Sequence, residues 1–274
     1  MKLIFESFFQ FNVHQMAILT FTTDFGSQDY YTGVIKGAII KQSPNLNIID
    51  ITNDIEPFNI VNGAFIVKNV YKDFPENTIH LVAVNNFYSN DDNRFIAVKY
   101  DNHYFIAPDN GILSLVFEND QPYECYELEY IAYTNFPLKE VFSRTVWHLT
   151  SGRPFHEIGD QLETITQKIY LQPVISPNQI KGSVIYIDHF ENVVINITKE
   201  LFDKVGHGRK FHIYFKRNDA ITKISHHYYD VEVGETICLF NSSGYLELAI
   251  NMGKAASMLG LKIEDIIQID FTVL

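Results

Sequence analysis

The stretch Thr22-Thr23-Asp24-Phe25-Gly26-Ser27-Gln28-Asp29-Tyr30 decides the fold of the first half of this chain. It follows an apolar, β-branched run at residues 17–21 and precedes a helical pattern. Such a sequence predicts a buried strand followed by a helix, and ligands bind at this end of the strands in open α/β sheets. Asp24 and Asp29 are therefore candidate ligand-binding residues.

A capping role is the alternative for these two acids, because a helix dipole stabilises carboxylates near the start of the helix. Asp29 alone fits a cap as well as it fits a ligand site. The pair fits a cap less well, because a single helix start does not need both Asp24 and Asp29.

Strand and helix patterns alternate from residue 17 to residue 152. Strands are predicted at 17–23, 46–51, 78–84, 95–100 and 103–107, and helices at about 30–42, 59–73, 111–117 and 139–151. This alternation with short connections is typical of an α/β domain, in which a mostly parallel sheet has helices on both faces. Residues 1–16 precede the domain as an N-terminal extension, and Met16 is the expected natural start.

The second half of the chain has a different pattern. Residues 153–180 contain three prolines and no sustained period, which predicts a linker. Residues 181–274 contain short segments rich in Val, Ile, Tyr and Phe that are separated by turn signals. The segments lie at 182–188, 192–197, 210–216, 221–225, 236–240, 245–250 and 266–273. They predict an all-β domain, a small barrel or sandwich.

The bulk composition limits the classes of partner. The formal net charge of −12 over 274 residues argues against nucleic acid or an anionic membrane and suits a cationic or zwitterionic small ligand. No apolar run reaches the ~18 residues of a membrane span. Two distant cysteines, Cys125 and Cys238, lack metal-ligand spacing and favour a reducing, cytoplasmic location. No metal site is predicted, since the adjacent His226 and His227 would face opposite sides of a strand.

Three further motifs each have a plain reading as a turn and a second reading as part of a site. Pro108-Asp109-Asn110-Gly111 is a turn at a strand end that could line a site beside the first loop. Asp188-His189-Phe190-Glu191-Asn192 is a hairpin whose Asn192 amide could bind the edge of a heterocycle, with Phe190 stacking on it. Asn241-Ser242-Ser243-Gly244 is a turn whose backbone amides could hold a carboxylate.

Taken in order, these motifs resemble the S-adenosyl-L-methionine (SAM) hydroxide adenosyltransferase family, the SAM hydrolases related to the fluorinase and chlorinase enzymes. The resemblance extends from Ala17 to about Phe271. Its markers are Thr23-Asp24-Phe25-Gly26 with Asp29, Gly33 to Gly37, Asp50-Ile51-Thr52, Pro108 to Gly111, Asp188 to Asn192 with Asn196, Ser242-Ser243-Gly244 through Glu247 to Asn251, Gly253 to Ala256 and Leu259-Gly260-Leu261.

The resemblance implies an α/β domain, a β-barrel domain and a homotrimer, with SAM held between the first domain of one subunit and the second domain of its neighbour. It assigns the ribose hydroxyls to Asp24 and the methionine ammonium to Asp29. Asp188 would contact the amino-acid end, Phe190 and Asn192 the adenine, and Ser242 and Ser243 the remaining polar edges. SAM would be the substrate or ligand, and no cofactor is implied.

The implied reaction is attack of water or hydroxide on C5′ of SAM, which yields adenosine and methionine. The chain departs from the family at the residues implicated in handling water. The family Asp position falls on Asn85, the family Arg position on Asn93 with Arg94 one step beyond, and the family His position on Pro137. Asn85 and Arg94 are therefore the candidate catalytic positions, while neither Asn85 nor Pro137 can accept a proton at neutral pH.

Neighbouring groups could replace the lost base. Asp91, Asp92 and Glu140 could turn toward the site, and His148 lies on the following helix, where a packing role is the alternative. Glu191 stands where the family has glycine, so its side chain could intrude on the adenine site.

Three hypotheses follow from these residues. The first is a SAM hydrolase with a degraded catalytic set, the second a non-catalytic SAM- or adenosine-binding protein, and the third a trimeric scaffold without a ligand. Binding is better supported than turnover, because most positions expected to hold the nucleoside are present.

Overall fold

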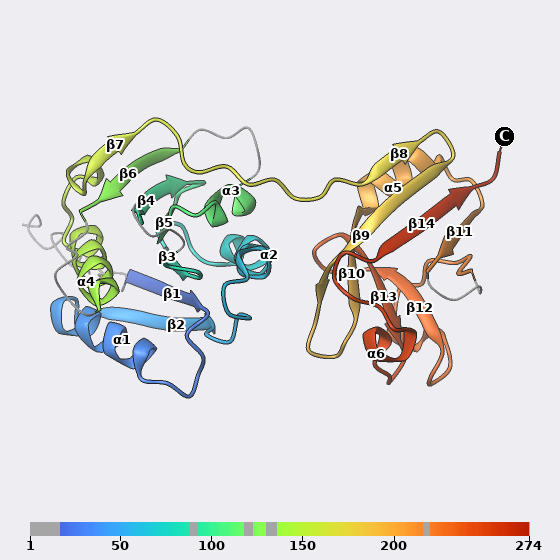
Figure 1. The fold of residues 1–274 in the computed structure, drawn as a ribbon, viewed down its shortest axis with the longest axis horizontal. Helices are drawn as coiled ribbons and strands as arrows, with labels where there is room; N and C mark the ends of the chain where they lie inside the picture. The colour runs from blue at the N-terminus through green and yellow to red at the C-terminus, as the bar shows by residue number, and fades with distance from the viewer. Residues whose placement is uncertain (1–16, 88–92, 118–122, 130–135, 216–219, 274) are drawn as a thin grey trace, which may run out of the picture. The chain divides into compact units, whose positions relative to one another are not determined.

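The computed structural model describes residues 17–87, 93–117, 123–129, 136–215 and 220–273. The expected N-terminal extension, residues 1–16, lies outside them. The chain forms two compact units, Met1–Lys168 and Ile169–Leu274 (Figure 1). Within the described residues, no helix is both long and apolar enough to cross a bilayer.

The first unit contains a seven-stranded sheet in the order β2-β1-β3-β5-β4-β6-β7. The strands are β1 (Ala17–Thr23), β2 (Leu46–Thr52), β3 (Ile79–Ala83), β4 (Phe95–Tyr100), β5 (His103–Pro108), β6 (Glu124–Leu128) and β7 (Asp160–Leu162). The pairs β1–β2, β1–β3 and β3–β5 are parallel, and the pairs β4–β5, β4–β6 and β6–β7 are antiparallel.

The sheet is therefore mixed, and the prediction of a mostly parallel sheet is wrong for its β4–β6–β7 side. The physical reason lies in the turn between β4 and β5. Asp101 and Asn102 both have a left-handed backbone, with φ values of 48° and 60°. Two such residues close a tight hairpin, which forces the strands on either side of it to run antiparallel.

Helices cover both faces of this sheet, as the sequence predicts (Figure 1). Helices α1 (Tyr31–Gln42) and α4 (Pro137–Thr150) lie on one face, and α2 (Ile60–Val70) and α3 (Ile112–Val116) on the other. Leu19 and Phe21 of β1 pack with Ile35 of α1 and Phe142 of α4 in one buried cluster. Alternate residues of a strand face opposite sides of the sheet, so a parallel strand needs apolar side chains of helices packed on both faces.

The predicted linker, residues 153–180, contains more structure than its composition indicates. A short 3₁₀ turn, η2 (Phe155–Glu157), precedes β7, which pairs with β6 of the first sheet. Strand β8 (Val174–Ser176) pairs with β9 (Gln179–Ile187) of the second unit. Strands of three residues are too short to show a period in the sequence.

The second unit is a curled antiparallel sheet in the order β11-β14-β9-β10-β13-β12, with β8 paired to β9. Its remaining strands are β10 (Val193–Thr198), β11 (Phe211–Tyr214), β12 (Thr236–Phe240), β13 (Tyr245–Ile250) and β14 (Ile266–Phe271). Val184, Ile195, Leu248 and Ile269 belong to its buried core. This agrees with the predicted all-β domain in outline, although no pairing of β11 with β12 closes the sheet among the described residues.

One expected strand of the second unit is wrong. The segment 221–225 forms only isolated bridges, at Ile221 and Ser225. Helix α5 (Lys199–Gly206) follows β10 and ends at the C-cap His207, which has a left-handed φ of 49°. The remaining short helices are η1 (Tyr71–Asp73), η3 (Tyr228–Asp230) and α6 (Ala255–Leu259).

Candidate functional site

Asp24 lies where three loops meet at the carboxyl edge of the first sheet. Its Oδ2 accepts hydrogen bonds from the backbone N–H of Phe58 and of Asn85, both at 3.0 Å. Phe58 and Asn85 both have a left-handed backbone, with φ values of 68° and 50°, and a bulky residue such as Phe58 rarely adopts this conformation. Backbone strain of this kind gathers at ligand sites. Asp24 Oδ1 accepts no hydrogen bond from a described residue and is therefore open to a ligand.

Asn110 fixes Asn85 from the other side. Its Nδ2 donates to the carbonyl oxygens of Val84 and Asn85, both at 2.9 Å. The main chain of Asn85 is thus held at its N–H by Asp24 and at its C=O by Asn110. The structure brings Asp24, Asn85 and the Pro108–Gly111 turn together at one edge, as the sequence predicts for strand ends of a parallel sheet.

Arg94 forms an ion pair with Asp109. Its Nε donates to Asp109 Oδ2 at 3.0 Å, and its Nη2 contacts the same oxygen. Asp109 is only 2% exposed, and its Oδ1 accepts a hydrogen bond from the backbone N–H of Thr166 at 2.7 Å. A buried carboxylate of this kind needs a cation. The charge of Arg94 is therefore used to compensate Asp109.

Asp29 is exposed and makes no hydrogen bond or ion pair with a described residue. The alternative capping role is not observed, because helix α1 has Tyr30 at its N-cap and no side-chain cap. The rings of Tyr30 and Tyr31 lie beside it in the chain, with their centroids 4.5 Å apart. The Asp29 carboxylate is thus available to a cationic ligand.

The groups considered as replacement bases are engaged elsewhere or lie outside the described residues. His148 is buried, and its Nε2 lies 2.9 Å from the carbonyl oxygen of Pro154. Glu140 lies 3.4 Å from Lys139 Nζ on the surface of α4. Pro137 is the buried first residue of the same helix, a position that suits proline. Asp91 and Asp92 fall outside the described residues.

In the second unit, Asp188 orients the side chain of Asn192. Asp188 Oδ1 accepts the Asn192 backbone N–H at 2.7 Å, and its Oδ2 accepts Asn192 Nδ2 at 3.0 Å. Since Nδ2 faces Asp188, the amide oxygen of Asn192 is the atom left to accept a hydrogen bond. The turn reading of this motif is confirmed, and the binding of a heterocycle by Asn192 stays a prediction.

A pocket of about 590 Å³ opens beside this loop. The residues that matter for its chemistry are Phe190, Asn192, Tyr228, Asn251, Met252 and Lys254. Phe190 is 70% exposed, so its ring offers a bare aromatic face. The volume is within the range of small-molecule sites. The structure thus brings Phe190 and Asn192 together, with Asp188 hydrogen-bonded to Asn192.

Glu191 does not intrude on this pocket, so the expectation of a steric conflict is wrong. Its carboxylate accepts hydrogen bonds from Lys254 Nζ at 2.9 Å and from the Ser257 backbone N–H at 3.0 Å, and it also contacts Ser257 Oγ. The hydrogen bonds from Ser257 and Lys254 lower the pKa of Glu191 to about 2. The left-handed backbone of Glu191, with φ 64°, accompanies this orientation toward α6.

Ser242 and Ser243 are exposed in the turn between β12 and β13. Asn241 Oδ1 closes this turn by accepting the backbone N–H groups of Ser243 and Tyr245, both at 3.1 Å. Neither serine lines the 590 Å³ pocket. Their predicted contact with the ligand stays a prediction.

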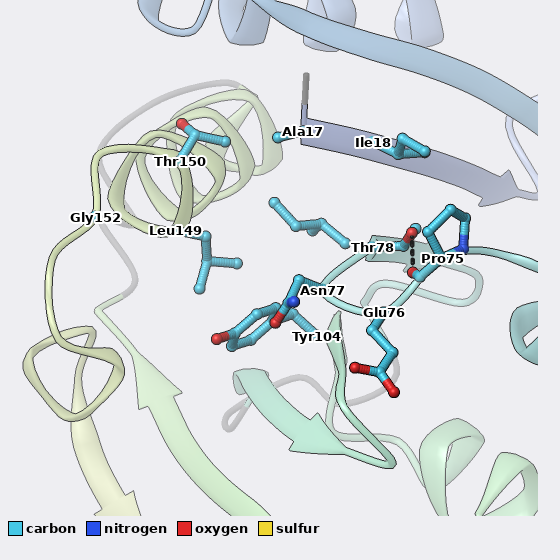
Figure 2. Close-up of a pocket in the computed structure, with 11 residues that line it drawn as sticks. Ala17, Ile18, Pro75, Glu76, Asn77, Thr78, Tyr104, Leu149, Thr150 and Gly152 are labelled. Atoms are coloured by element: carbon cyan, nitrogen blue, oxygen red, sulfur yellow. Dashed lines mark hydrogen bonds between the residues drawn. The ribbon is translucent and has the colours of Figure 1, made fainter. Parts of the chain in front are cut away.

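A second pocket of about 340 Å³ lies at the opposite, amino edge of the first sheet (Figure 2). Glu76, Thr78 and Tyr104 are among its lining residues, and no predicted site residue is. Thr78 Oγ1 donates to the Pro75 carbonyl oxygen at 2.6 Å, which is the dashed bond in Figure 2. The carboxyl edge remains the candidate site, because ligands of α/β sheets bind there.

Sequence reasoning missed two residues of these sites. Phe58 follows Pro57 and precedes the N-cap Asn59, but no sequence signal reveals its left-handed backbone or its bond to Asp24. Tyr228, which no sequence motif marks as a site residue, is 44% exposed and lines the larger pocket. The short pattern around it gave no sign that it would face a cavity.

The comparisons with known proteins identify the family. Residues 19–159 match the SAM hydroxide adenosyltransferase N-terminal domain, and residues 182–268 match the corresponding C-terminal domain. The chain belongs to the SAM hydroxide adenosyltransferase family.

Individual members of this family are similar to this chain over nearly their whole length. An (R)-S-adenosyl-L-methionine hydrolase of Methanocaldococcus jannaschii is 27% identical over 270 residues, which cover 92% of this chain and 95% of that protein. A fluorinase of Actinopolyspora mzabensis is 25% identical, and the match covers 89% of this chain and 94% of that protein. The crystal structure of an uncharacterized conserved protein from Thermotoga maritima has a TM-score of 0.81 and 30% identity, and the match covers 93% of this chain and 99% of that one.

Proposed function

We propose that this adenosyltransferase-family chain binds SAM and cleaves it slowly to adenosine and methionine. The observation that carries the proposal is the geometry of Asp24. One of its oxygens is fixed by two strained backbone N–H groups, and the other is open at the carboxyl edge. An anchored carboxylate of this kind is suited to accept hydrogen bonds from the two ribose hydroxyls.

The other ligand contacts follow from the residues already described. The exposed Asp29 would pair with the methionine ammonium. Phe190 would stack on the adenine, and the fixed amide oxygen of Asn192 would accept a hydrogen bond from its exocyclic amine. Asp188, Ser242 and Ser243 are proposed to bind the remaining polar groups.

The reaction requires little chemistry from the protein. The oxygen of a water molecule forms a bond to C5′, the C5′–S bond breaks, and the sulfonium sulfur takes the bonding pair to give neutral methionine thioether. The water proton is released to solvent. The sulfonium is already a good leaving group, so alignment of water and C5′ supplies most of the acceleration.

Turnover is proposed to be slow because the residues at the family base positions cannot accept a proton. Asn85 carries an amide, Pro137 is buried in α4, and Arg94 is engaged by Asp109. A positioned general base typically contributes ~10²–10⁴ in rate. Without one, water must attack before it is deprotonated.

The engagement of Arg94 also favours a second candidate, a non-catalytic protein that binds SAM or adenosine. In both cases SAM is a substrate or ligand, and no cofactor or metal is invoked. The homotrimer and the cytoplasmic location implied by the resemblance are part of the same proposal. A trimeric scaffold without ligand is the remaining alternative.

Titration calorimetry followed by product analysis separates these candidates. The proposal expects heat of binding with SAM and with adenosine, then adenosine formation above the uncatalysed background after long incubation with SAM. Binding without adenosine formation would favour the non-catalytic protein. If neither compound binds, the trimeric scaffold without ligand is the candidate that remains.

Asn85→Asp alone should raise turnover by less than ~10-fold, well below the ~10²–10⁴ of a positioned base. Asp tolerates the left-handed backbone of position 85, so the variant should fold. The new carboxylate would still lack the family histidine at Pro137 and a free Arg94. The measurement is the rate of adenosine release compared with the unmodified chain. A gain of a hundredfold would show that Asn85 is the single defect.

A further inference from the structure

Glu247 is a buried carboxylate in the middle of β13, with 4% of its surface exposed. No ion pair is recorded for it among the described residues. Its two oxygens have separate partners. Oε1 accepts the Tyr228 hydroxyl at 2.7 Å, and Oε2 accepts Asn241 Nδ2 at 3.2 Å. Burying a carboxylate without a cation is costly, so two hydrogen bonds to side chains from different segments need an explanation.

The first partner, Tyr228, forms part of the wall of the 590 Å³ pocket. Its short 3₁₀ turn is fixed at both ends. Asp230 accepts the backbone N–H groups of His226 and His227 at 2.9 and 3.1 Å, and Asn251 Nδ2 donates to the Val231 carbonyl oxygen at 2.8 Å. The main chain is therefore held by Asp230 and Asn251, and the ring is held by Glu247.

The second partner, Asn241, begins the turn that carries Ser242 and Ser243. Its Oδ1 already accepts two backbone N–H groups within that turn. The amide therefore cannot flip, and Nδ2 must face Glu247. One carboxylate thus connects the wall of the pocket with the turn of serines.

We propose that Tyr228 is a further ligand-contacting residue of the nucleoside pocket, which offers its ring face to the base, and that Glu247 is the positioning residue that holds that ring and couples it to the Ser242–Ser243 turn. This inference rests on the proposed binding of an adenine nucleoside. Since the Tyr228 hydroxyl donates its hydrogen bond to Glu247, the ring, and not the hydroxyl, is the part that contacts the ligand. The site should therefore select for a flat aromatic base.

The test is calorimetry with adenosine as the probe, using the full chain. Tyr228→Leu should weaken adenosine binding about 10-fold, the usual effect of removing one aromatic stacking partner of a base. Tyr229→Leu is the matched control, because Tyr229 is adjacent, 76% exposed and absent from the pocket wall. It should leave the affinity unchanged. Tyr228 is half-exposed, so its replacement should not prevent folding.

Glu247→Gln tests the positioning role. Glutamine has one acceptor oxygen in place of two, so the Tyr228 hydroxyl and Asn241 Nδ2 compete for it and one of the two bonds is lost. In the Tyr228→Leu background the same oxygen is free to accept Asn241 Nδ2. Adenosine binding should weaken several-fold in the unmodified background and should not weaken further in the Tyr228→Leu background. A purely structural role would give equal losses in both backgrounds.

The outcomes distinguish this inference from the function on which it rests. No adenosine binding by the unmodified chain would overturn both. Binding by the unmodified chain with unchanged affinity in Tyr228→Leu would overturn the role of Tyr228 alone. Additive losses in the double variant would overturn the positioning role of Glu247.

Discussion

Asp24→Asn should weaken the binding of both SAM and adenosine about 10- to 100-fold, because hydrogen bonds to a charged acceptor contribute roughly 1.5–3 kcal/mol. The substitution is nearly isosteric. Its amide oxygen can take the place of Oδ2 and accept the N–H groups of Phe58 and Asn85. Its amide nitrogen then replaces Oδ1 and cannot accept the ribose hydroxyls. Calorimetry measures the loss, and thermal unfolding checks that the fold is kept.

Asp29→Asn is the matched control on the same loop. It should weaken the binding of SAM and of methionine but leave the affinity for adenosine unchanged, because only SAM and methionine carry the ammonium group. Asp24→Ala is a poorer test, since it would also release the two loops held by Oδ2. Unchanged adenosine affinity in Asp24→Asn, or equal losses of adenosine affinity in both variants, would contradict the assignment of the two carboxylates.

The free energy of unfolding should fall by about 1.4 kcal/mol per pH unit below pH 6.5 on account of His80 alone. His80 is 2% exposed, its Nδ1 lies 2.8 Å from Thr20 Oγ1, and its Nε2 lies 3.2 Å from His103 Nδ1. Burial, and then the neighbouring His103, lowers the pKa of His80 from 6.5 to about 3.

The sign follows from which state binds the proton. Above pH 6.5 His80 is neutral in both the folded and the unfolded chain. As the pH falls from 6.5 toward about 3, the unfolded chain is protonated at this residue and the folded chain is not, so stability is lost. Burial also lowers the pKa of His103, which adds to the effect, although Asp101 and Glu76 oppose it.

Denaturant unfolding between pH 6 and pH 4 measures this slope. His80→Gln, which keeps a polar side chain but does not titrate, should reduce the slope by about 1.4 kcal/mol per pH unit. His212→Gln should leave it unchanged, because His212 is exposed. A wild-type slope in His80→Gln would show that His80 is protonated equally in both states.

Much of the fold could be predicted where strands are buried and bounded by turns. The predicted bounds of 17–23, 95–100, 236–240 and 245–250 are those of β1, β4, β12 and β13. The direction of β4 could not be read from its own residues, because it depends on the two-residue hairpin that joins it to β5. The three-residue strands β7 and β8 were missed because they carry too few residues to show a pattern.

The sequence predicts candidate site residues but not the geometry that holds them. Asp24 was identified from its place after a strand, whereas its two hydrogen bonds come from loops 34 and 61 residues away. Glu191 shows the opposite error. Its position beside Asn192 suggested a conflict, but its partners Lys254 and Ser257 lie more than 60 residues further along the chain and draw the carboxylate toward α6. Contacts at such separations are not visible in a single sequence.

The most direct test of SAM-type nucleoside binding is a crystal structure of the chain with adenosine. We expect the ribose hydroxyls within hydrogen-bond distance of Asp24 Oδ1, and the base between Phe190 and Tyr228 with its exocyclic amine on Asn192. Adenosine bound away from Asp24, or the Asp24 and Asp29 carboxylates facing no ligand at all, would contradict the proposed function.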